Sequence, residues 1–517
     1  FGSSIQYQEQ RCLPEQSLGP QAFCFADSHF PVMGNVVPPS DEGLPDVLPL
    51  PCEISEHWKA LQAISAVPAV TTLEALEERM ARYCSGSELR QLRGLRSALC
   101  SNAGLDEELT GRLSEYLTPC ATEMRLSDFF ARTLPSIIRR ALALPRLSAQ
   151  SGPLRTLRQG VRSQLKIPRE LSASLLANMF LCSFDAIFNQ MPGNAAMPSP
   201  SFTQLLGSAA STEVGKLRMF LHFFERIAEQ TLEGEIAIDR VVGVALLQTE
   251  WLASAEPLLP LQVAPHGVGF ETALDLAHAD FANMFIGGGV LSGGCVQEEI
   301  RFSICPELCL SMLFCPCMRA DEAIQIIGSE QFSAYSGYAR SLKYAGDHVD
   351  GAQRSADSSL RTAVLAMDAL DLRCGNKSLA AQMEPEKLLR ELNKSLAAFM
   401  PVDTGSAKLY PMVATGNWGC GAFGGCAPLK ALLQWASASQ CGRCLRYFPF
   451  QESFGPELES LAVRAAEAGV SVGQLLSALW ALRPIDENVD LQLLEAVSVK
   501  LSPDPKRKRG MSLSQIG

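Results

Sequence analysis

The spacing of apolar residues along the chain changes near Ile236, and this change constrains the fold more than any other feature. From His57 to about Gly234, apolar residues recur at spacings of three or four, as in Leu217–Ile227, which predicts α-helices. After Ile236, short apolar runs alternate with helical stretches, a pattern typical of a β-sheet with helices on its faces. We therefore expect an accessory α-helical domain followed by an α/β domain.

The second part of the chain supplies the individual elements of that α/β domain. The expected strands are Leu261–Val263, Ile324–Ile327, Val364–Met367, Met412–Ala414 and Leu445–Phe448. The expected helices are Glu298–Phe314, Glu384–Phe399, Leu429–Ser437 and much of 456–499. In open α/β sheets, ligands bind beyond the carboxyl ends of the strands, so we expect the site in the loops that follow them.

These patterns divide the chain into five segments. They are an extended proline-rich arm or linker (1–55), the accessory helical domain (56–235), the α/β domain (236–455), helices packed on it (456–500) and a basic tail (501–517). In the tail, Lys506–Arg509 is either a nuclear-import signal or part of a solvated terminus. The chain starts at Phe1 without a visible signal segment, and no apolar run reaches the roughly 20 residues of a membrane span.

Composition limits the classes of function. The 517 residues are 47% hydrophobic and 19% charged, which suits a globular protein with an ample core. A net charge of -11 argues against nonspecific nucleic-acid binding by the whole surface, yet it allows a local basic pocket. The 17 scattered cysteines indicate reduced thiols in a cytosolic or nuclear protein.

The metal-ligating residue types form no convincing cluster in the sequence. Cys441 and Cys444 form a CxxC pair without a second pair or clustered histidines nearby, so ordinary thiols are favoured over a zinc or redox role. The six histidines are dispersed. We therefore predict neither a metal site nor another cofactor.

The segment Ala279–Phe302 carries the most chemical information. The consecutive glycines Gly287, Gly288 and Gly289 cost backbone entropy, which unusual dihedral angles or close approach to a ligand would justify. Backbone N–H groups in such a loop suit a pyrophosphate. A plain glycine-rich turn is the alternative.

The sequence Gln297-Glu298-Glu299 follows the glycines at what looks like the start of a helix. Adjacent helical residues point about 100° apart, so the two glutamates cannot do the same job. Cleavage of a glycosidic bond needs a carboxyl group that protonates the leaving oxygen and a carboxylate that activates water or stabilises the oxocarbenium ion. The alternative is a pair of acids placed at a helix start because the helix dipole favours them there.

A second glycine-rich loop, Thr415–Gly425, lies between an expected strand and an expected helix and has five glycines in eleven residues. This placement suits a phosphate, and the loop lacks the Lys-Ser/Thr of a P-loop, which disfavours nucleotide triphosphate hydrolysis. We expect Trp418 and Phe423 to anchor the loop in the core. Phe450, at a strand end, has an aromatic face that suits a base.

On these motifs the chain resembles the eukaryotic-type poly(ADP-ribose) glycohydrolases. The resemblance covers roughly residues 120–455 and rests on the triple glycine with Gln297–Glu299, on Gly328–Tyr338 and Thr415–Gly425, and on Ser174–Phe180 and Phe223–Ile227 in the helical region. It implies a macrodomain-like mixed β-sheet flanked by helices, with an N-terminal accessory helical domain. It also implies hydrolysis of ribose–ribose O-glycosidic bonds of poly(ADP-ribose), mainly from the free end, with release of ADP-ribose and without a cofactor.

The resemblance also implies roles for individual residues. Glu299 would be the acid/base, and Glu298 would bind the neighbouring ribose hydroxyls. Asp280 and Asn283 would position Glu299 and the ribose, and Gln297 would lie near the adenine. The other implied substrate contacts are Gly287, Gly288, Gly289, Tyr338, Phe450, and, around the diphosphate, Asn417, Gly419, Gly421, Ala422, Phe423 and Gly424.

One implied contact needs a shift in the alignment. The family's acidic residue that recognises adenine matches Glu271 only with a small shift, because the ungapped match falls on Phe270. The segment from Leu372 to Tyr410 and the part after Ser453 resemble the family weakly, so helices there are predicted from periodicity alone.

The implied partners are poly(ADP-ribose), ADP-ribose and ADP-ribosylated proteins, without direct DNA or membrane binding. We expect a monomer that acts in the nucleus, the cytoplasm or both, in the response to DNA damage. The chief rival is a macrodomain that binds ADP-ribose without cleaving it. Such a protein would keep the glycine loops and aromatic residues but would not need Glu298 and Glu299, whose presence favours catalysis. A scaffold built on the helical region is the third possibility, and no specific feature favours it.

Overall fold

The computed structural model describes residues 38–54, 58, 132–208, 210–373, 375–402, 410–450, 452–483 and 492–501. The basic run Lys506–Arg509, the arm before residue 38 and most of the predicted helical region before residue 132 lie outside these ranges. Among the residues described, no helix is both long enough and apolar enough to cross a bilayer.

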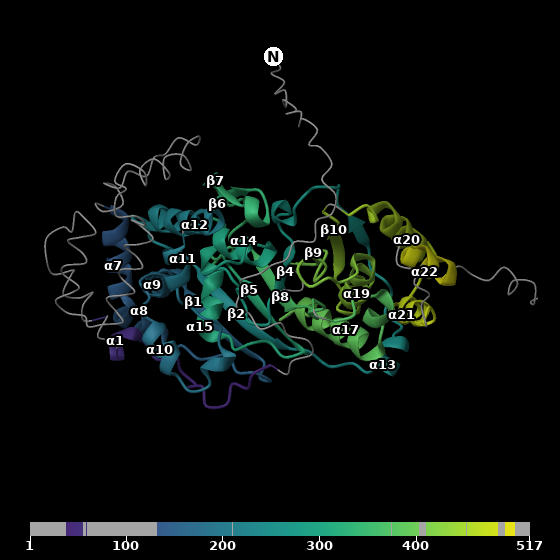
Figure 1. Cartoon of the computed structure of the whole chain (residues 1–517), viewed down its shortest axis with the longest axis horizontal. Helices are drawn as coiled ribbons and strands as arrows, with labels where there is room; N and C mark the ends of the chain where they lie inside the picture. The colour runs from purple at the N-terminus through teal and green to yellow at the C-terminus, as the bar shows by residue number, and fades with distance from the viewer. Residues whose placement is uncertain are drawn as a thin grey trace, which may run out of the picture. The chain divides into compact units, whose positions relative to one another are not determined.

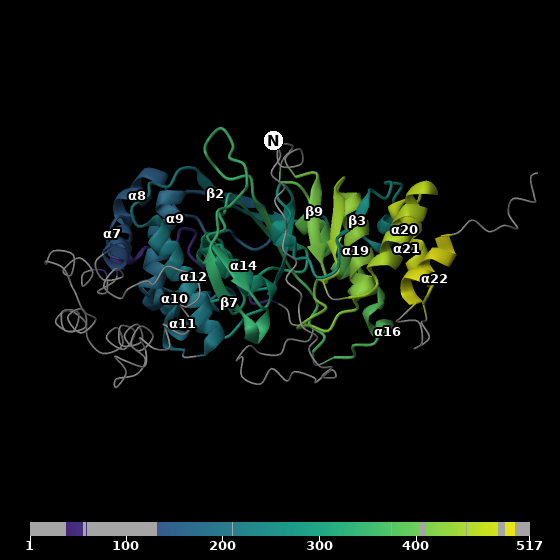
Figure 2. The same ribbon diagram turned by 90° about the horizontal axis from the view of Figure 1, so that it is seen from above.

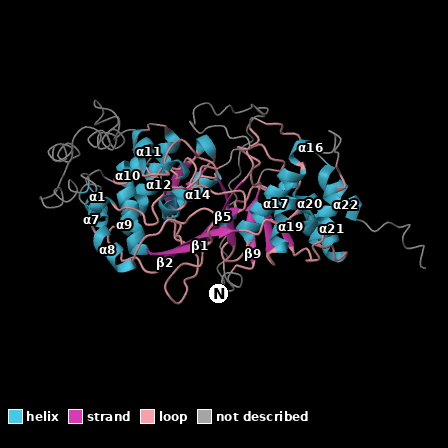
Figure 3. Cartoon of the chain, turned by 90° about the horizontal axis from the view of Figure 1, so that it is seen from below, coloured by secondary structure: helices cyan, strands magenta, loops and turns pink. Residues whose placement is uncertain are grey.

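A mixed sheet of eight strands runs through the protein between two groups of helices (Figures 1 and 3). From one edge to the other the strands are β1 (Ser163–Pro168), β2 (Glu235–Val242), β5 (Glu322–Ile327), β8 (Ala363–Asp368), β4 (Ala277–Ala282), β9 (Met412–Gly416), β10 (Cys444–Phe448) and β3 (Leu261–Val263). The last five are mutually parallel, whereas β5 is antiparallel to both of its neighbours and β1 is antiparallel to β2. The carboxyl ends of β8, β4, β9 and β10 therefore lie next to one another. They form one edge of the sheet that runs across the strands, as distinct from the outermost strands β1 and β3.

Helices cover both faces, so the central strands are buried on both sides. One face packs against α9 (Arg169–Phe180), α12 (Ser211–Ile227) and α14 (Gln297–Ile304), and the other against α17 (Pro385–Phe399) and α19 (Ala427–Gln440). In β8, Val364 and Ala366 belong to the first core, while Leu365 and Met367 belong to the second. Strands buried on both faces have nearly continuous apolar sequences, which explains why the short apolar runs predicted these strands correctly.

The remaining elements are short or lie at the periphery. The helices are α1 (Pro51–Ile54), α7 (Leu134–Leu142), α8 (Leu144–Ser151), α10 (Asp185–Gln190), α11 (Thr203–Gly207), α13 (Gln248–Leu252), α15 (Ser311–Phe314), α16 (Leu379–Gln382), α20 (Gly455–Glu467), α21 (Val472–Trp480) and α22 (Leu493–Leu501). The 3-10 helices are η2 (Asn194–Ala196), η3 (Phe270–Thr272), η4 (Pro306–Leu310) and η5 (Ala339–Ser341). A separate hairpin consists of β6 (Ser333–Ser336) and β7 (Lys343–Asp347), with η5 in its turn.

The prediction that residues 56–235 are helical throughout was wrong at β1. Leu165 and Ile167 point inward there while Gln164 and Lys166 are exposed, which is the two-residue period of a strand. β1 pairs with β2, which begins at Glu235, so this region supplies an edge of the large sheet. In the described part of this region the helices are present. Phe180 of α9 and Phe220 of α12 both pack edge to face on Phe202, which precedes α11, and Phe180 also packs on Phe224 of α12.

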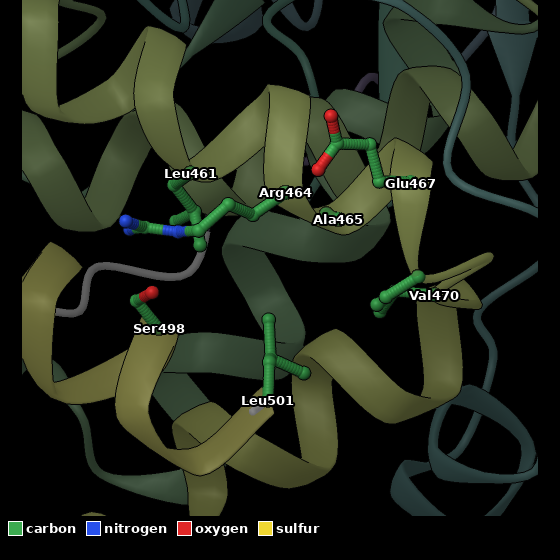
Figure 4. Close-up of a pocket in the computed structure, with 8 residues that line it drawn as sticks. Leu461, Arg464, Ala465, Glu467, Val470, Ser498 and Leu501 are labelled. Atoms are coloured by element: carbon green, nitrogen blue, oxygen red, sulfur yellow. The ribbon is translucent and has the colours of Figure 1, made fainter. Parts of the chain in front are cut away.

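The predicted C-terminal helices are confirmed as α20, α21 and α22 in the residues described. A surface pocket of about 300 Å³ lies between α20 and α22 (Figure 4). Its lining mixes apolar side chains such as Leu461 and Leu501 with Arg464 and Ser498. These helices lie away from α14 (Figures 1 and 2), so this pocket is separate from the glutamate pair.

A buried ion pair links strands β2 and β5 beneath the first core. Arg240 donates from Nη1 to Oε2 of Glu322 at 2.5 Å, and from Nε to the carbonyl of Leu157 at 2.8 Å. Both charged side chains are fully buried. We expect Arg240→Met to lower the free energy of unfolding by about 3–5 kcal/mol, because Glu322 then keeps a buried charge without its partner.

Urea denaturation tests this expectation. Lys387→Met is the control, because Lys387 pairs with the half-exposed Glu384, and such surface pairs contribute only about 0–1 kcal/mol. The double variant Arg240→Met/Glu322→Gln should recover part of the loss, since the unpaired charge is gone. A loss in Arg240→Met no greater than in the control would contradict the prediction.

Candidate active site

The first turn of α14 carries the glutamate pair, and both carboxylates bind the loop that precedes the helix. Glu298 is 2% exposed, and its two oxygens accept hydrogen bonds from the N–H of Asn283 at 2.8 Å and of Gly287 at 2.6 Å. Burial raises the pKa of Glu298 well above its ordinary value, and the nearby acids Asp280 and Glu299 raise it further. Glu298 thus fixes the start of the loop to the helix.

Glu299 is held in the same way, further along the loop. It is 7% exposed, and its oxygens accept from the N–H of Gly289 at 2.9 Å and of Val296 at 2.8 Å. The contact with Val296 closes the first turn of the helix, as an acid at this position commonly does. Four backbone amides therefore fix the positions of the two adjacent carboxylates.

The triple glycine makes room for these carboxylates. Gly287 has φ +90° and Gly288 has φ +49°, values that other residues rarely adopt. A Cβ on Gly288 would lie 2.6 Å from Oε2 of Glu298 and 2.6 Å from Oε1 of Glu299. Any other residue at position 288 would collide with both side chains.

The expectation that this first glycine loop cradles a pyrophosphate was wrong for its three central amides. The N–H of Gly287 and that of Gly289 donate to the glutamates, and the N–H of Gly288 donates to the carbonyl of Phe285 at 3.0 Å. The dihedral angles are unusual, as predicted, but all three amides have acceptors within the chain, two of them the carboxylates of Glu298 and Glu299.

Asp280 lies at the inner side of the pair, on β4. Its side chain is fully buried, and neither oxygen has a hydrogen-bond partner in the part of the chain that the structure describes. Burial raises the pKa of Asp280 to about 8, with Glu299 adding to the rise and Arg301 opposing it. The acid is therefore protonated near neutral pH.

Gln297 and Asn283 connect β4 with α14. Oε1 of Gln297 accepts from the N–H of Phe281 at 2.8 Å, and its buried Nε2 finds no acceptor among the residues described. Oδ1 of Asn283 accepts from the N–H of Phe285 at 3.0 Å. Gln297 thus keeps a donor that a bound molecule can use.

Two exposed aromatic rings lie against each other. Tyr338, from the β6–β7 hairpin, and Phe450, after β10, are 43% and 40% exposed, and their ring centroids are 5.8 Å apart. Burial of the hydroxyl raises the pKa of Tyr338 to about 12, with a contribution from the charge of Glu299. Tyr338 therefore lies close to Glu299, and the two rings offer a surface for stacking.

Glu271, rather than Phe270, presents its side chain toward this region. The ring of Phe270 is buried against Phe281 and Phe448, with centroids 5.8 Å apart in each pair. The side chain of Glu271 forms a hydrogen bond with Tyr335, another residue of the hairpin. The family's acidic residue can be matched to Phe270 or, with a small shift, to Glu271. Only Glu271 supplies a carboxylate in this region.

The second glycine loop follows β9 and is anchored at its base. Trp418 is fully buried and donates from Nε1 to the carbonyl of Met367 at 3.0 Å, as expected of a core anchor. Nδ2 of Asn417 donates to the carbonyl of Pro449 at 2.9 Å, and its Oδ1 accepts from the hydroxyl of Tyr447 at 2.8 Å. Asn417 therefore ties this loop to the one that carries Phe450. Phe423 is only partly buried and packs under Arg373, so it is a weaker anchor than expected.

The amides of this second loop are largely unused, in contrast to those of the first. Within the described ranges, five N–H groups of this loop donate to no protein acceptor. They belong to Gly419 and to the four consecutive residues Gly421, Ala422, Phe423 and Gly424. Beneath the loop, the ammonium of Lys430 lies 4.2 Å from the centroid of the Trp418 ring and pairs with Glu391. Unpaired amides in a glycine-rich loop suit an anionic ligand.

The cysteines and possible metal ligands show no comparable arrangement. No group of three or more His, Cys, Asp or Glu side chains that could hold a metal ion occurs in the described parts of the chain. Cys441 and Cys444 are free thiols, and burial raises the pKa of each.

A mixed β-sheet flanked by helices, with a carboxylate pair and a glycine loop after neighbouring parallel strands, defines an α/β protein of the macrodomain class. Comparison with known families agrees: residues 248–454 match "Poly (ADP-ribose) glycohydrolase (PARG), Macro domain fold", and residues 121–240 match the helical domain of the same family. The chain belongs to the poly(ADP-ribose) glycohydrolase family.

Individual relatives show the extent of the similarity. The chain is 31% identical over 350 residues to poly(ADP-ribose) glycohydrolase 1 of Arabidopsis thaliana, covering 54% of this chain and 63% of that protein. It is 30% identical over 408 residues to the probable poly(ADP-ribose) glycohydrolase 2 of the same plant, covering 68% and 77%. For poly(ADP-ribose) glycohydrolase 1 of Caenorhabditis elegans the identity is 30% over 344 residues, covering 64% of this chain and 42% of the relative. The chain thus spans less than two thirds of the first and third of these proteins.

The clash at position 288 generates a prediction with a matched control. Gly288→Ala should displace both carboxylates and lower hydrolytic turnover by roughly 10²-fold or more, the order expected when catalytic groups move by about 1 Å. Gly469→Ala is the control, because Gly469 also has a positive φ, +61°, but has open space around it. Turnover is measured as release of ADP-ribose from poly(ADP-ribose). Equal activity of the two variants would show that the contact at residue 288 is unimportant.

The raised pKa of Asp280 makes a distinct prediction about stability. The folded state binds this proton more tightly than the unfolded state, where the pKa of Asp280 is near 3.8. The stability that the bound proton contributes to the wild-type protein is therefore complete below about pH 4 and is lost as the pH rises through 8. The amide that replaces the acid in Asp280→Asn does not titrate. The melting temperature of Asp280→Asn relative to wild type should therefore rise steadily between pH 4 and pH 8, as followed by differential scanning fluorimetry. A difference that stays constant with pH would contradict the assignment.

Proposed function

We propose that this chain hydrolyses the ribose–ribose O-glycosidic bonds of poly(ADP-ribose), mainly from the free end of the polymer, and releases ADP-ribose. Membership of the family supports the proposal, and one observation carries it. Glu299 is held by two amides at the start of α14, on the sheet edge where the second glycine loop leaves five amides unpaired. An acid and an anion site are thus both present at this edge.

The second glycine loop would bind the diphosphate of the terminal ADP-ribose through the amides of residues 419 and 421–424. Tyr338 and Phe450 would stack on the nucleoside, while Glu271 and the unpaired Nε2 of Gln297 would recognise adenine. Gly287, Gly288 and Gly289 would bring the loop backbone close to the ribose. The substrate would then lie along the edge with its scissile bond at α14.

Glu299 would act twice in the reaction. As an acid it would protonate the leaving ribose oxygen, and as a carboxylate it would then take a proton from the attacking water. Glu298 would bind the adjacent ribose hydroxyls. A carboxylate has about four lone-pair sites, so its two bonds to the loop leave room for these hydroxyls. Protonated Asp280 would add no negative charge beside the pair.

The geometry favours catalysis over mere recognition of ADP-ribose. A non-catalytic macrodomain needs the diphosphate loop and the stacking rings, but not a loop built around two carboxylates. Here backbone N–H groups in and around the first glycine loop donate to Glu298 and Glu299 and are not left free for a ligand.

We extend the proposal to partners and place of action. The substrate would be polymer attached to ADP-ribosylated proteins, and the enzyme would act as a monomer without direct contact to DNA or membranes. The described cysteines are all free thiols, which supports work in the nucleus or cytoplasm, where thiols stay reduced, during the response to DNA damage. Size-exclusion chromatography with light scattering tests the monomer, and fractionation of cells tests the compartment.

Substitution of the proposed acid/base is the decisive test. Glu299→Gln should lower the release of ADP-ribose from poly(ADP-ribose) by roughly 10²–10⁴-fold, the usual contribution of a general acid/base. Binding of ADP-ribose, measured by calorimetry, should stay within about threefold, because the diphosphate loop and the rings are untouched. A wild-type protein that binds the polymer and releases nothing would favour the non-catalytic reader.

A further inference from the structure

A lysine from the helical region reaches the loop that carries the catalytic carboxylates. Lys216 lies on α12, and its side chain is fully buried. Its ammonium donates to the carbonyls of Gly289 at 3.2 Å and of Ser292 at 2.5 Å, and also to that of Gly294. An ammonium has three N–H donors, so all of them are used on one short stretch of the loop.

The stretch that binds Lys216 through its carbonyls also binds Glu299 through an N–H group. Gly289 donates its N–H to Oε1 of Glu299 and accepts from Lys216 with its carbonyl. The carbonyl of Gly289 also accepts the N–H groups of Ser292 and Gly294, which closes the loop on itself. Lys216 and Glu299 are therefore linked through a single residue.

Burying this cation is costly unless the surroundings compensate. Burial lowers the pKa of Lys216, while the charges of Glu299 and Glu213, with smaller contributions from Cys295 and Cys309, raise it. A long apolar residue would fill the same space without that cost. The charge and the three donors are therefore retained for what they hold in place.

We propose that Lys216 is a positioning residue of the catalytic centre: its ammonium fixes the carbonyls of residues 289–294 and so keeps the Gly289 amide directed at Glu299. This inference rests on the proposed function. It gives the helical region a direct part in the reaction, because Lys216 lies in the segment that matches the helical domain while Glu299 lies in the macrodomain segment.

The test compares two buried lysines. Lys216→Met removes the charge and the donors at similar volume. Lys394→Met is the matched control, because Lys394 is equally buried, donates to the carbonyl of Glu322 at 2.7 Å and pairs with Asp368, but contacts neither glutamate of the pair. Both proteins are assayed at a temperature below both melting points.

We expect Lys216→Met to lower kcat for ADP-ribose release by roughly 10–100-fold, as loss of a residue that orients a catalytic group does. KM and the Kd for ADP-ribose should change by no more than about threefold, since the second glycine loop is unaffected. Lys394→Met should lose a similar amount of melting temperature but keep kcat within about threefold. Equal kcat values for the two variants would overturn the proposal.

Hydrogen exchange gives a readout that does not depend on activity. Amides of residues 287–296 should exchange faster in Lys216→Met than in wild type, while those of 416–425 stay unchanged. Unchanged exchange in 287–296 would also overturn the proposal. If Lys216→Met does not fold, Lys216→Gln, which keeps N–H donors without the charge, replaces it and should show a smaller loss of kcat. A wild-type protein that releases no ADP-ribose would refute the proposed function alone, because the exchange data would still decide the role of Lys216.

Discussion

Four hydrogen bonds from backbone amides to Glu298 and Glu299 organise the edge of the sheet on which the chemistry depends. They connect the end of β4 to the start of α14 and give each carboxylate one orientation. Charged acceptors form stronger hydrogen bonds than neutral ones, and the helix N-terminus adds its own positive potential. The raised pKa of Glu298 shows that these contributions offset only part of the cost of burying two adjacent acids. The glycines between the bonded amides follow from the same constraint, because a side chain at position 288 would occupy the space of both carboxylates.

The two glycine loops at this edge have opposite properties although their sequences look alike. In the first, Gly287 and Gly289 donate their N–H groups to the chain's own carboxylates and so orient the acids. In the second, Trp418 and Asn417 fix the base, and the amides of residues 419 and 421–424 remain without protein acceptors in the described ranges. The proposed cleavage of a sugar bond next to a diphosphate would use both loops: an oriented carboxylic acid at the first and an open anion site at the second. Neither loop alone would distinguish an enzyme from a binding protein.

Sequence reasoning succeeded where burial leaves a simple pattern and failed where tertiary contacts decide. The five expected strands are confirmed because strands buried on both faces have short apolar runs. β4 was missed because its sequence, AHADFA, places His278 and Asp280 inside the core. The glycine positions and the glutamate pair were visible in the sequence, but the partners of their amides were not, since hydrogen-bond allocation depends on loop geometry. Lys216 was missed for a related reason: a lysine in an amphipathic helix usually lies in solvent, and only the folded loop shows that it is buried.

The helical region and the macrodomain share one β-sheet and one hydrophobic core in the part of the chain that the structure describes. β1 lies within the helical region and β2 at its boundary, yet both extend the sheet beyond β5. Without them β5 would become an edge strand with unpaired backbone groups, and the first core would lose the packing of α9 and α12. Support for the active edge comes from both layers, since Lys216 on α12 lies behind the first glycine loop and Lys430 on α19 lies beneath the second. Separation of the two regions would therefore remove an edge of the sheet and one of the two buried lysines that lie beside the loops.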